Sequence, residues 1–186
     1  MNPTLNKKDF EDLTTNLKDL AYSYIEKYSP SKQQLKAYLL KKYLFKIKGT
    51  QSKKEVTLII DQIIENLEEN RVVNDELYSD SKARMFLRRG YSLNKIQQSL
   101  MIKGIDKEFI RNSINKIKED KIEPDFVSAL KLCKRRRIGP IRPEDNRKIF
   151  YKKDMGILAR NGFSFELSRK VLDLDLEEFK KLIRII

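Results

Sequence analysis

Apolar residues recur along almost the whole chain at spacings of three and four, whereas strict alternation over the length of a strand is scarce. The clearest stripe comprises Val56, Ile59, Ile60, Ile63, Ile64 and Leu67, and another comprises Leu13, Leu17, Leu20 and Tyr24. Charged residues lie between the members of each stripe, which is typical of amphipathic helices. The five prolines and six glycines fall mostly between the periodic segments. The pattern therefore predicts an all-α fold.

A three-fold recurrence emerges when Ser31, Ser92 and Ser164 are aligned. Each serine is followed eight residues later by a leucine: Leu39, Leu100 and Leu172. Two residues before the serine stand Ser29, Gly90 and Gly162, respectively. Glycine tolerates the left-handed turn that ends a helix, and serine is a preferred N-cap. We expect each serine to begin a helix directly after such a turn.

The recurrence predicts an elongated array of three tandem three-helix repeats, because one unit of this size hides too little apolar surface to be stable alone. The expected division is a tail over 1–11, a first repeat over 12–73 with a long loop at 44–51, and a second repeat over 74–121. The third repeat, over 122–186, contains an extra basic helix and an insertion at 135–148.

Composition excludes most familiar chemistry. The chain has 186 residues, 36% of them charged, with one cysteine and no histidine. A disulfide framework, a Cys/His zinc site and a Ser-His-Asp triad are therefore excluded, and neither a Walker loop nor a dinucleotide-binding glycine motif is present. We predict no enzymatic activity and no catalytic, cofactor-binding or metal-binding residue. No uncharged stretch is long enough to span a bilayer and no signal peptide opens the chain, so we expect a cytoplasmic protein without membrane contact.

The net charge of +13 favours a polyanionic partner. The excess lies in residues 82–121, with 11 basic and 4 acidic side chains, and in residues 131–160, with 11 basic and 3 acidic. Arginines cluster in both blocks, and the planar guanidinium group suits phosphate oxygens. The alternative is an ordinary solvated helix surface. From charge density, the candidate nucleic-acid or filament contacts are Arg84, Arg88, Arg89, Lys95, Lys103, Arg135, Arg136, Arg137, Arg142 and Arg147.

Other interpretations remain open. Residues 92–115 fit a helix-turn-helix, with Lys107, Arg111 and Asn115 on the recognition face, although three-helix packing gives the same spacing. The aromatic residues Tyr91, Phe163, Phe86 and Phe109 resemble stacking platforms for bases, but helical spacing favours a core role. Cys133 is most simply a buried small side chain. A basic helical protein associated with translation is a third class.

Three segments, in order, resemble the RecX regulatory proteins. NDELYSDSKARMFLRRGYSLNKIQQSLMIKGID (74–106) is similar to the central RecX repeat, with its acidic start, arginine helix, glycine turn and Lys-Gly-Ile. AYSYIEKYSPSKQQLKAYLLKK (21–42) resembles the first repeat, and RRRIGPIR (135–142) with LARNGFSFELSRKVL (158–172) the third. The chain departs from the family at Tyr78-Ser79, where Phe-Ala is usual, and at Asn94 and Ser99, where Arg or Lys is common.

The resemblance implies a non-enzymatic modulator of the RecA recombinase. Such a protein binds the filament that RecA forms with single-stranded DNA and mainly inhibits its recombinase activity. We expect a monomer whose basic residues contact the filament, and whether they touch DNA or RecA stays open.

Overall fold

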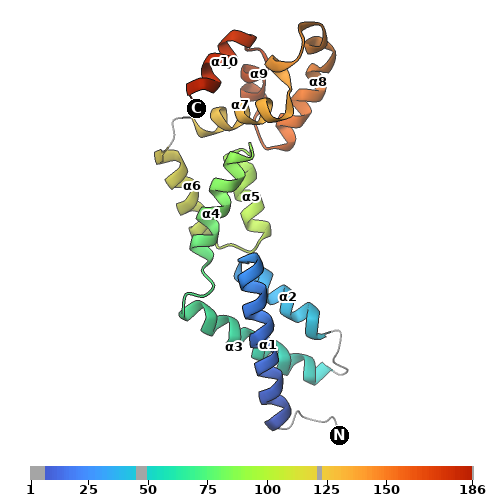
Figure 1. Ribbon diagram of the computed structural model, residues 1–186, viewed down its shortest axis with the longest axis vertical. Helices are drawn as coiled ribbons and strands as arrows, with labels where there is room; N and C mark the ends of the chain where they lie inside the picture. The colour runs from blue at the N-terminus through green and yellow to red at the C-terminus, as the bar shows by residue number, and fades with distance from the viewer. Residues whose placement is uncertain (1–6, 45–49, 121–122, 186) are drawn as a thin grey trace. The chain divides into compact units, whose positions relative to one another are not determined.

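The computed structural model describes residues 7–44, 50–120 and 123–185 (Figure 1). Within these ranges it contains α-helices, one short 3-10 turn and no strand, which confirms the all-α prediction. Two compact units divide the chain. Unit 1 holds α1 (Lys7–Tyr28), α2 (Lys32–Leu44), α3 (Thr50–Glu69), the segment through Tyr78, and the turn Lys103–Asp106. Unit 2 holds the remaining residues, Ser79–Ile102 and Lys107–Ile186.

The helices of unit 2 begin with most of α4, which spans Asp75–Arg88 and starts in unit 1. They continue with α5 (Leu93–Ile102), α6 (Lys107–Asp120), α7 (Pro124–Arg136), the 3-10 turn η1 (Gly139–Ile141), α8 (Glu144–Arg160), α9 (Phe165–Leu172) and α10 (Leu176–Ile185). No helix in the described ranges is both long enough and apolar enough to cross a membrane.

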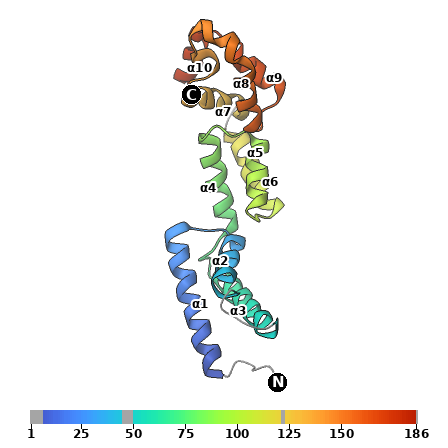
Figure 2. The same ribbon diagram turned by 90° about the vertical axis from the view of Figure 1, so that its right-hand side faces the viewer.

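Unit 1 has its core between α1, α2 and α3, which lie side by side in both views (Figures 1 and 2). All six residues of the predicted α3 stripe are buried, from Val56 at 0% exposure to Ile64 at 8%. They pack with Leu17 and Ala21 of α1 and with Leu35 and Leu39 of α2. The amphipathic pattern thus predicted which face of α3 turns inward.

A second core lies among α7, α8, α9 and α10 of unit 2. Leu158 and Val171 are fully buried there, and Phe179 of α10 closes the cluster. Cys133 is also fully buried, as predicted, and burial raises the pKa of its thiol to about 12. This side chain behaves as a small apolar residue of the core.

The predicted corners are confirmed by their hydrogen bonds. The hydroxyls of Ser31, Ser92 and Ser164 each accept a hydrogen bond from the backbone N–H three residues later, at 3.3, 3.1 and 3.2 Å. Gly90 and Gly162 have φ values of +75° and +87°. Ser29, at the first corner, is also left-handed with φ +41°. The serines therefore act as N-caps after a left-handed residue.

A further recurrence joins distant segments. The carboxylate of Asp75, at the start of α4, accepts a hydrogen bond from the N–H of Lys32 at the start of α2, at 2.9 Å. Asp125, at the start of α7, accepts one from the N–H of Leu93 at the start of α5, at 2.7 Å. The start of α7 therefore binds the start of α5 in the same way as the start of α4 binds the start of α2. The grouping of the helices into three tandem repeats stays a prediction.

Helix boundaries refine the expected segments. Helix α1 already begins at Lys7 within the expected tail, and Leu44, Thr50 and Gln51 of the expected loop are helical. The rest of that loop, 45–49, and residues 1–6 of the tail lie outside the described residues. Most of the insertion expected over 135–148 is ordered structure, since α7 ends at Arg136, η1 follows and α8 starts at Glu144.

Candidate functional site

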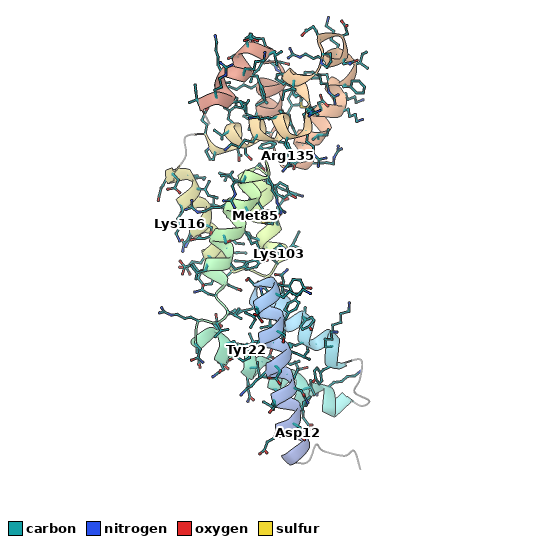
Figure 3. The ribbon with its side chains drawn as sticks, viewed as in Figure 1. Asp12, Tyr22, Met85, Lys103, Lys116 and Arg135 are labelled. Carbon is teal, nitrogen blue, oxygen red and sulfur yellow. The ribbon has the colours of Figure 1, made fainter. Side chains whose placement is uncertain are left out.

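The ten candidate basic residues fall into three groups: five exposed side chains at the ends of α4 and α7, two arginines held by internal contacts, and three others. Arg88 and Arg89 lie at the end of α4, and Arg135, Arg136 and Arg137 at the end of α7. All five are exposed. Figure 3 labels Arg135 on α7 and Met85 on α4. The local reason for this placement is that cations are favoured near a helix C-terminus by about 0.3–1 kcal/mol.

Helix α7 packs against the end of α4. The hydroxyl of Ser128 lies 2.8 Å from the carbonyl oxygen of Tyr91 and 3.1 Å from that of Leu87, and so donates to the last turn of α4 and to the turn that follows it. At Gly90 the approach is so close that an added Cβ would stand 2.7 Å from the Cβ of Leu132. The end of α4 is therefore fixed against the middle of α7.

This packing brings basic residues of the two helices together. Residues Ser128, Lys131 and Arg135 follow at i, i+3 and i+7, and so share one face of α7. Arg88 and Lys131 line the same small hollow with Leu87, Val127 and Ser128. We define the α4–α7 basic surface as Arg88, Arg89, Lys134, Arg135, Arg136 and Arg137.

None of these six side chains makes an ion pair or a side-chain hydrogen bond within the described part of the chain. Arginine carries five N–H donors in a planar fork that matches carboxylate and phosphate oxygens. Among the described residues, these six exposed cations have no internal counter-charge, and such a group attracts negatively charged surfaces.

Arg142 is different, because its guanidinium group is held inside unit 2. Its Nε and Nη2 donate to the two carboxylate oxygens of Asp154 at 2.6 and 2.7 Å. The Asp154 side chain is only 1% exposed and also accepts from the N–H of Gly139 at 2.9 Å. The guanidinium carbon lies 4.6 Å from the ring centre of Phe150. The hydrogen bond to Asp154 raises the pKa of Arg142, which stays charged as a structural group.

Arg147 likewise has internal partners. Its Nη2 donates to the carbonyl oxygens of Leu172 and Leu174 at 2.9 and 2.6 Å, and so satisfies the C-terminal end of α9. Its side chain is 18% exposed. We therefore omit Arg142 and Arg147 from the basic surface, although charge density alone had included them.

The other three candidates are not members of the α4–α7 basic surface. Arg84 forms an ion pair with Asp120 at 2.9 Å, and both side chains are about half exposed. Lys95 and Lys103 are half-buried. The carbonyl oxygen of Lys103 accepts a hydrogen bond from the hydroxyl of Ser31 at 2.9 Å, which assigns this residue to unit 1. Sequence reasoning placed all ten in one group because it lacked these long-range contacts.

Sequence reasoning did not select one further basic face, on α8. Its exposed cations are Lys148, Lys152, Lys153 and Arg160. Their spacing of four, five and twelve residues from Lys148 would have revealed a shared outer face, had the helix been known to begin at Glu144.

The structure also bears on the helix-turn-helix interpretation and on the aromatic residues considered for base stacking. Lys107, Arg111 and Asn115 are exposed on α6, as a recognition face requires. Phe86 and Phe163 are 8% and 6% exposed, which confirms that they belong to the core. No group of three or more His, Cys, Asp or Glu residues able to hold a metal ion occurs among the residues that the structure describes.

Similarity to known proteins decides the family. The chain is 31% identical to the regulatory protein RecX of Myxococcus xanthus (strain DK1622) over 165 residues, which is 86% of this chain and 85% of that protein. The chain belongs to the RecX family. It is 30% identical to RecX of Agrobacterium fabrum over 61% of this chain and 58% of that protein. With RecX of Clostridioides difficile the identity is 29%, over 65% and 56%.

No protein-family model matches the chain, and no solved structure matches it either. RecX membership therefore rests on these curated relatives, and it supports the residue-level resemblance of residues 21–42, 74–106 and 135–172.

Proposed function

We propose that this protein binds the RecA nucleoprotein filament and restrains recombinase activity through the α4–α7 basic surface. The observation that carries the proposal is the 31% identity to a regulatory protein RecX over 86% of the chain. The expected setting is the cytoplasm, and the expected mode is non-enzymatic.

The basic surface supports this proposal on physical grounds. A RecA filament offers two kinds of negative charge, the DNA phosphates and acidic side chains of the protein. Exposed arginines without internal partners attract both, and long-range attraction speeds encounter with such a target. The packing of α4 on α7 fixes the backbone positions of these residues, so binding does not first have to bring the two helix ends together.

The test is a triple charge reversal, Arg135→Glu, Arg136→Glu and Arg137→Glu. Each charge-assisted hydrogen bond contributes about 1.5–3 kcal/mol, so the loss of one or more weakens binding at least about tenfold. The expected result is a rise of at least about tenfold in the protein concentration that halves RecA strand exchange. Helical circular dichroism is retained, because all three side chains are exposed.

The matched control carries the same change in charge on α6: Lys107→Glu, Arg111→Glu and Lys118→Glu. These side chains are also exposed. We expect this variant to inhibit strand exchange close to the parent level. Full inhibition by the folded α7 variant would show that the surface is wrongly assigned. An equal loss of inhibition in both variants would show that only the net charge of the protein matters.

The second candidate function is a stand-alone helix-turn-helix DNA-binding protein that uses residues 92–115. The exposed Lys107, Arg111 and Asn115 favour it, as does the left-handed Gly104 between α5 and α6, with φ +74°. It predicts the opposite ranking of the two variants, together with sequence-selective binding to bare duplex DNA. The two functions are therefore separated by the same pair of proteins.

A further inference from the structure

A tier of three tyrosines in ring contact lies in unit 1, at a distance along the chain from the basic blocks. The rings of Tyr24 and Tyr38 are 3.9 Å apart at 8°, an almost parallel stack. Tyr28 continues the tier, with its ring centre 4.8 Å from that of Tyr24 and a tilt of 46°. Tyr24 and Tyr28 belong to α1 and Tyr38 to α2.

The inner part of the tier is rigid and its outer ring is exposed. Tyr24 and Tyr38 are half-buried and pack against the core of unit 1, which fixes their orientation. Tyr28 is 54% exposed and lies outside that core cluster. Its hydroxyl has no hydrogen bond to any residue that the structure describes, so neither the core nor a polar partner explains its position.

Lysines stand at both ends of the tier. The ammonium of Lys27 lies 5.4 Å from the ring centre of Tyr28, and that of Lys42 lies 5.9 Å from the ring centre of Tyr38. Both lysines are exposed. Contacts of this kind contribute only about 0.5–1 kcal/mol at exposed sites, so an incoming planar group can displace the lysine from Tyr28.

We propose that Tyr28 is a stacking platform for an unpaired nucleobase, with Tyr24 and Tyr38 as its rigid support. Single-strand binding proteins combine exposed aromatic rings with cations that contact the phosphates, and each stacked base contributes independently of its sequence. The exposed face of Tyr28 receives the base, and Lys27 then meets the phosphate beside it. The site belongs to unit 1, whereas the α4–α7 basic surface belongs to unit 2, and base stacking does not depend on RecA.

The aromatic residues that sequence reasoning considered for stacking are not these. Phe86 and Phe163 are buried. The ring of Tyr91 is stacked on that of Phe86, with 5.2 Å between the ring centres and an interplanar angle of 3°. Tyr24 and Tyr28 are four residues apart on α1, but the stack of Tyr24 with Tyr38 depends on contact between α1 and α2, which the spacing along one helix does not reveal.

The first experiment measures binding of the full chain to two single-stranded oligonucleotides of equal length, one of oligo(dT) and one of abasic sites. Both carry the same phosphates, and only the first carries bases. The parent is expected to bind oligo(dT) at least about fivefold more tightly. Tyr28→Ala is expected to lose this difference, with oligo(dT) affinity falling by about 5- to 150-fold, as expected for one stacked base.

Three further variants make the result specific. Tyr28→Phe keeps the ring and is expected to restore the preference for bases. Tyr22→Ala, on the same helix and labelled in Figure 3, removes a tyrosine of almost equal exposure, 52%, outside the tier and is expected to behave as the parent. The Arg135–Arg137 reversal is expected to weaken both oligonucleotides alike, because phosphates are common to both.

The chain allows a direct optical readout, because it has no tryptophan and its fluorescence comes from eight tyrosines. Oligo(dT) is expected to quench the parent more than Tyr28→Ala. Equal binding of abasic DNA and oligo(dT) by the parent would overturn the proposal. So would a Tyr28→Ala variant that keeps the preference for bases, or one that loses only its binding to RecA without DNA, since the tier would then be a protein contact.

Discussion

The division of the arginines into exposed and internal groups gives a quantitative prediction about Arg142. This side chain is 19% exposed and forms two hydrogen bonds with Asp154, which is 1% exposed. In Arg142→Ala, the carboxylate of Asp154 stays buried and keeps only the N–H of Gly139 as a partner.

The magnitude follows from this geometry. Removal of one partner of a buried ion pair costs about 3–5 kcal/mol, because the other charge is left without compensation. Loss of the contact between the guanidinium and Phe150 adds to this cost. We therefore expect the free energy of unfolding of Arg142→Ala to fall by about 3–5 kcal/mol. Arg135→Ala, at an exposed position, is expected to stay within about 0.5 kcal/mol of the parent.

The assay is urea unfolding followed by circular dichroism, with the parent, Arg142→Ala and Arg135→Ala measured side by side. Arg142→Lys keeps the charge but loses the fork, and is expected to fall between them. The reasoning would be refuted if Arg142→Ala unfolded within about 1 kcal/mol of the parent, since a buried pair would then be absent.

The remaining predictions concern the corners and the buried carboxylates. Gly90→Val places a branched side chain at φ +75° with its Cβ 2.7 Å from the Cβ of Leu132, and is expected to cost at least about 2 kcal/mol, seen as a lower melting temperature. A melting temperature equal to the parent's would contradict the assignment of Gly90 to a tightly packed left-handed turn. Burial raises the pKa of Asp75 above 3.8, so just above that value the folded state binds more protons than the unfolded state and stability falls as pH rises. Asp75→Asn keeps an oxygen for the N–H of Lys32 and removes this titration, so its stability relative to the parent is expected to rise with pH through that window in urea titrations, and a constant difference would contradict the burial argument.

Sequence patterns within a few residues predicted most of the helices and their ends. The spacing of apolar residues predicted the buried face of α3, and the glycine and serine residues predicted the corners at Gly90 and Gly162. These features depend on contacts within a few residues of the chain, such as the N–H of Leu167 on the hydroxyl of Ser164. A single sequence records such contacts directly, because the residue types follow from the local backbone.

Contacts between distant segments could not be predicted in the same way. The N–H of Ser92 donates to the carbonyl oxygen of Asn161, just before Gly162. The hydroxyl of Ser31 donates to the carbonyl oxygen of Lys103, just before Gly104. In both cases a serine that begins a helix is bound to the residue before a glycine turn, so the turn at Gly162 corresponds to the turn at Gly104. The serine alignment instead pairs Gly162 with Gly90. Both glycines end a helix, and sequence alone does not show which turn meets which helix start.

The same limit applies to the candidate site. Arg137 and Arg142 are five residues apart in a basic run, yet one is exposed and the other is bound to a buried carboxylate. Their difference depends on Asp154, which lies on α8 and whose burial follows from the packing of η1 on that helix. Charge density predicted a basic surface, and the tertiary contacts selected its members.

The most direct test of the central claim is retention of the parent protein on immobilised single-stranded DNA, with and without bound RecA, at one fixed salt concentration. A regulator of the RecA filament predicts stronger retention when RecA is present, with loss of that gain in the Arg135–Arg137 reversal. Equal retention with and without RecA would contradict it.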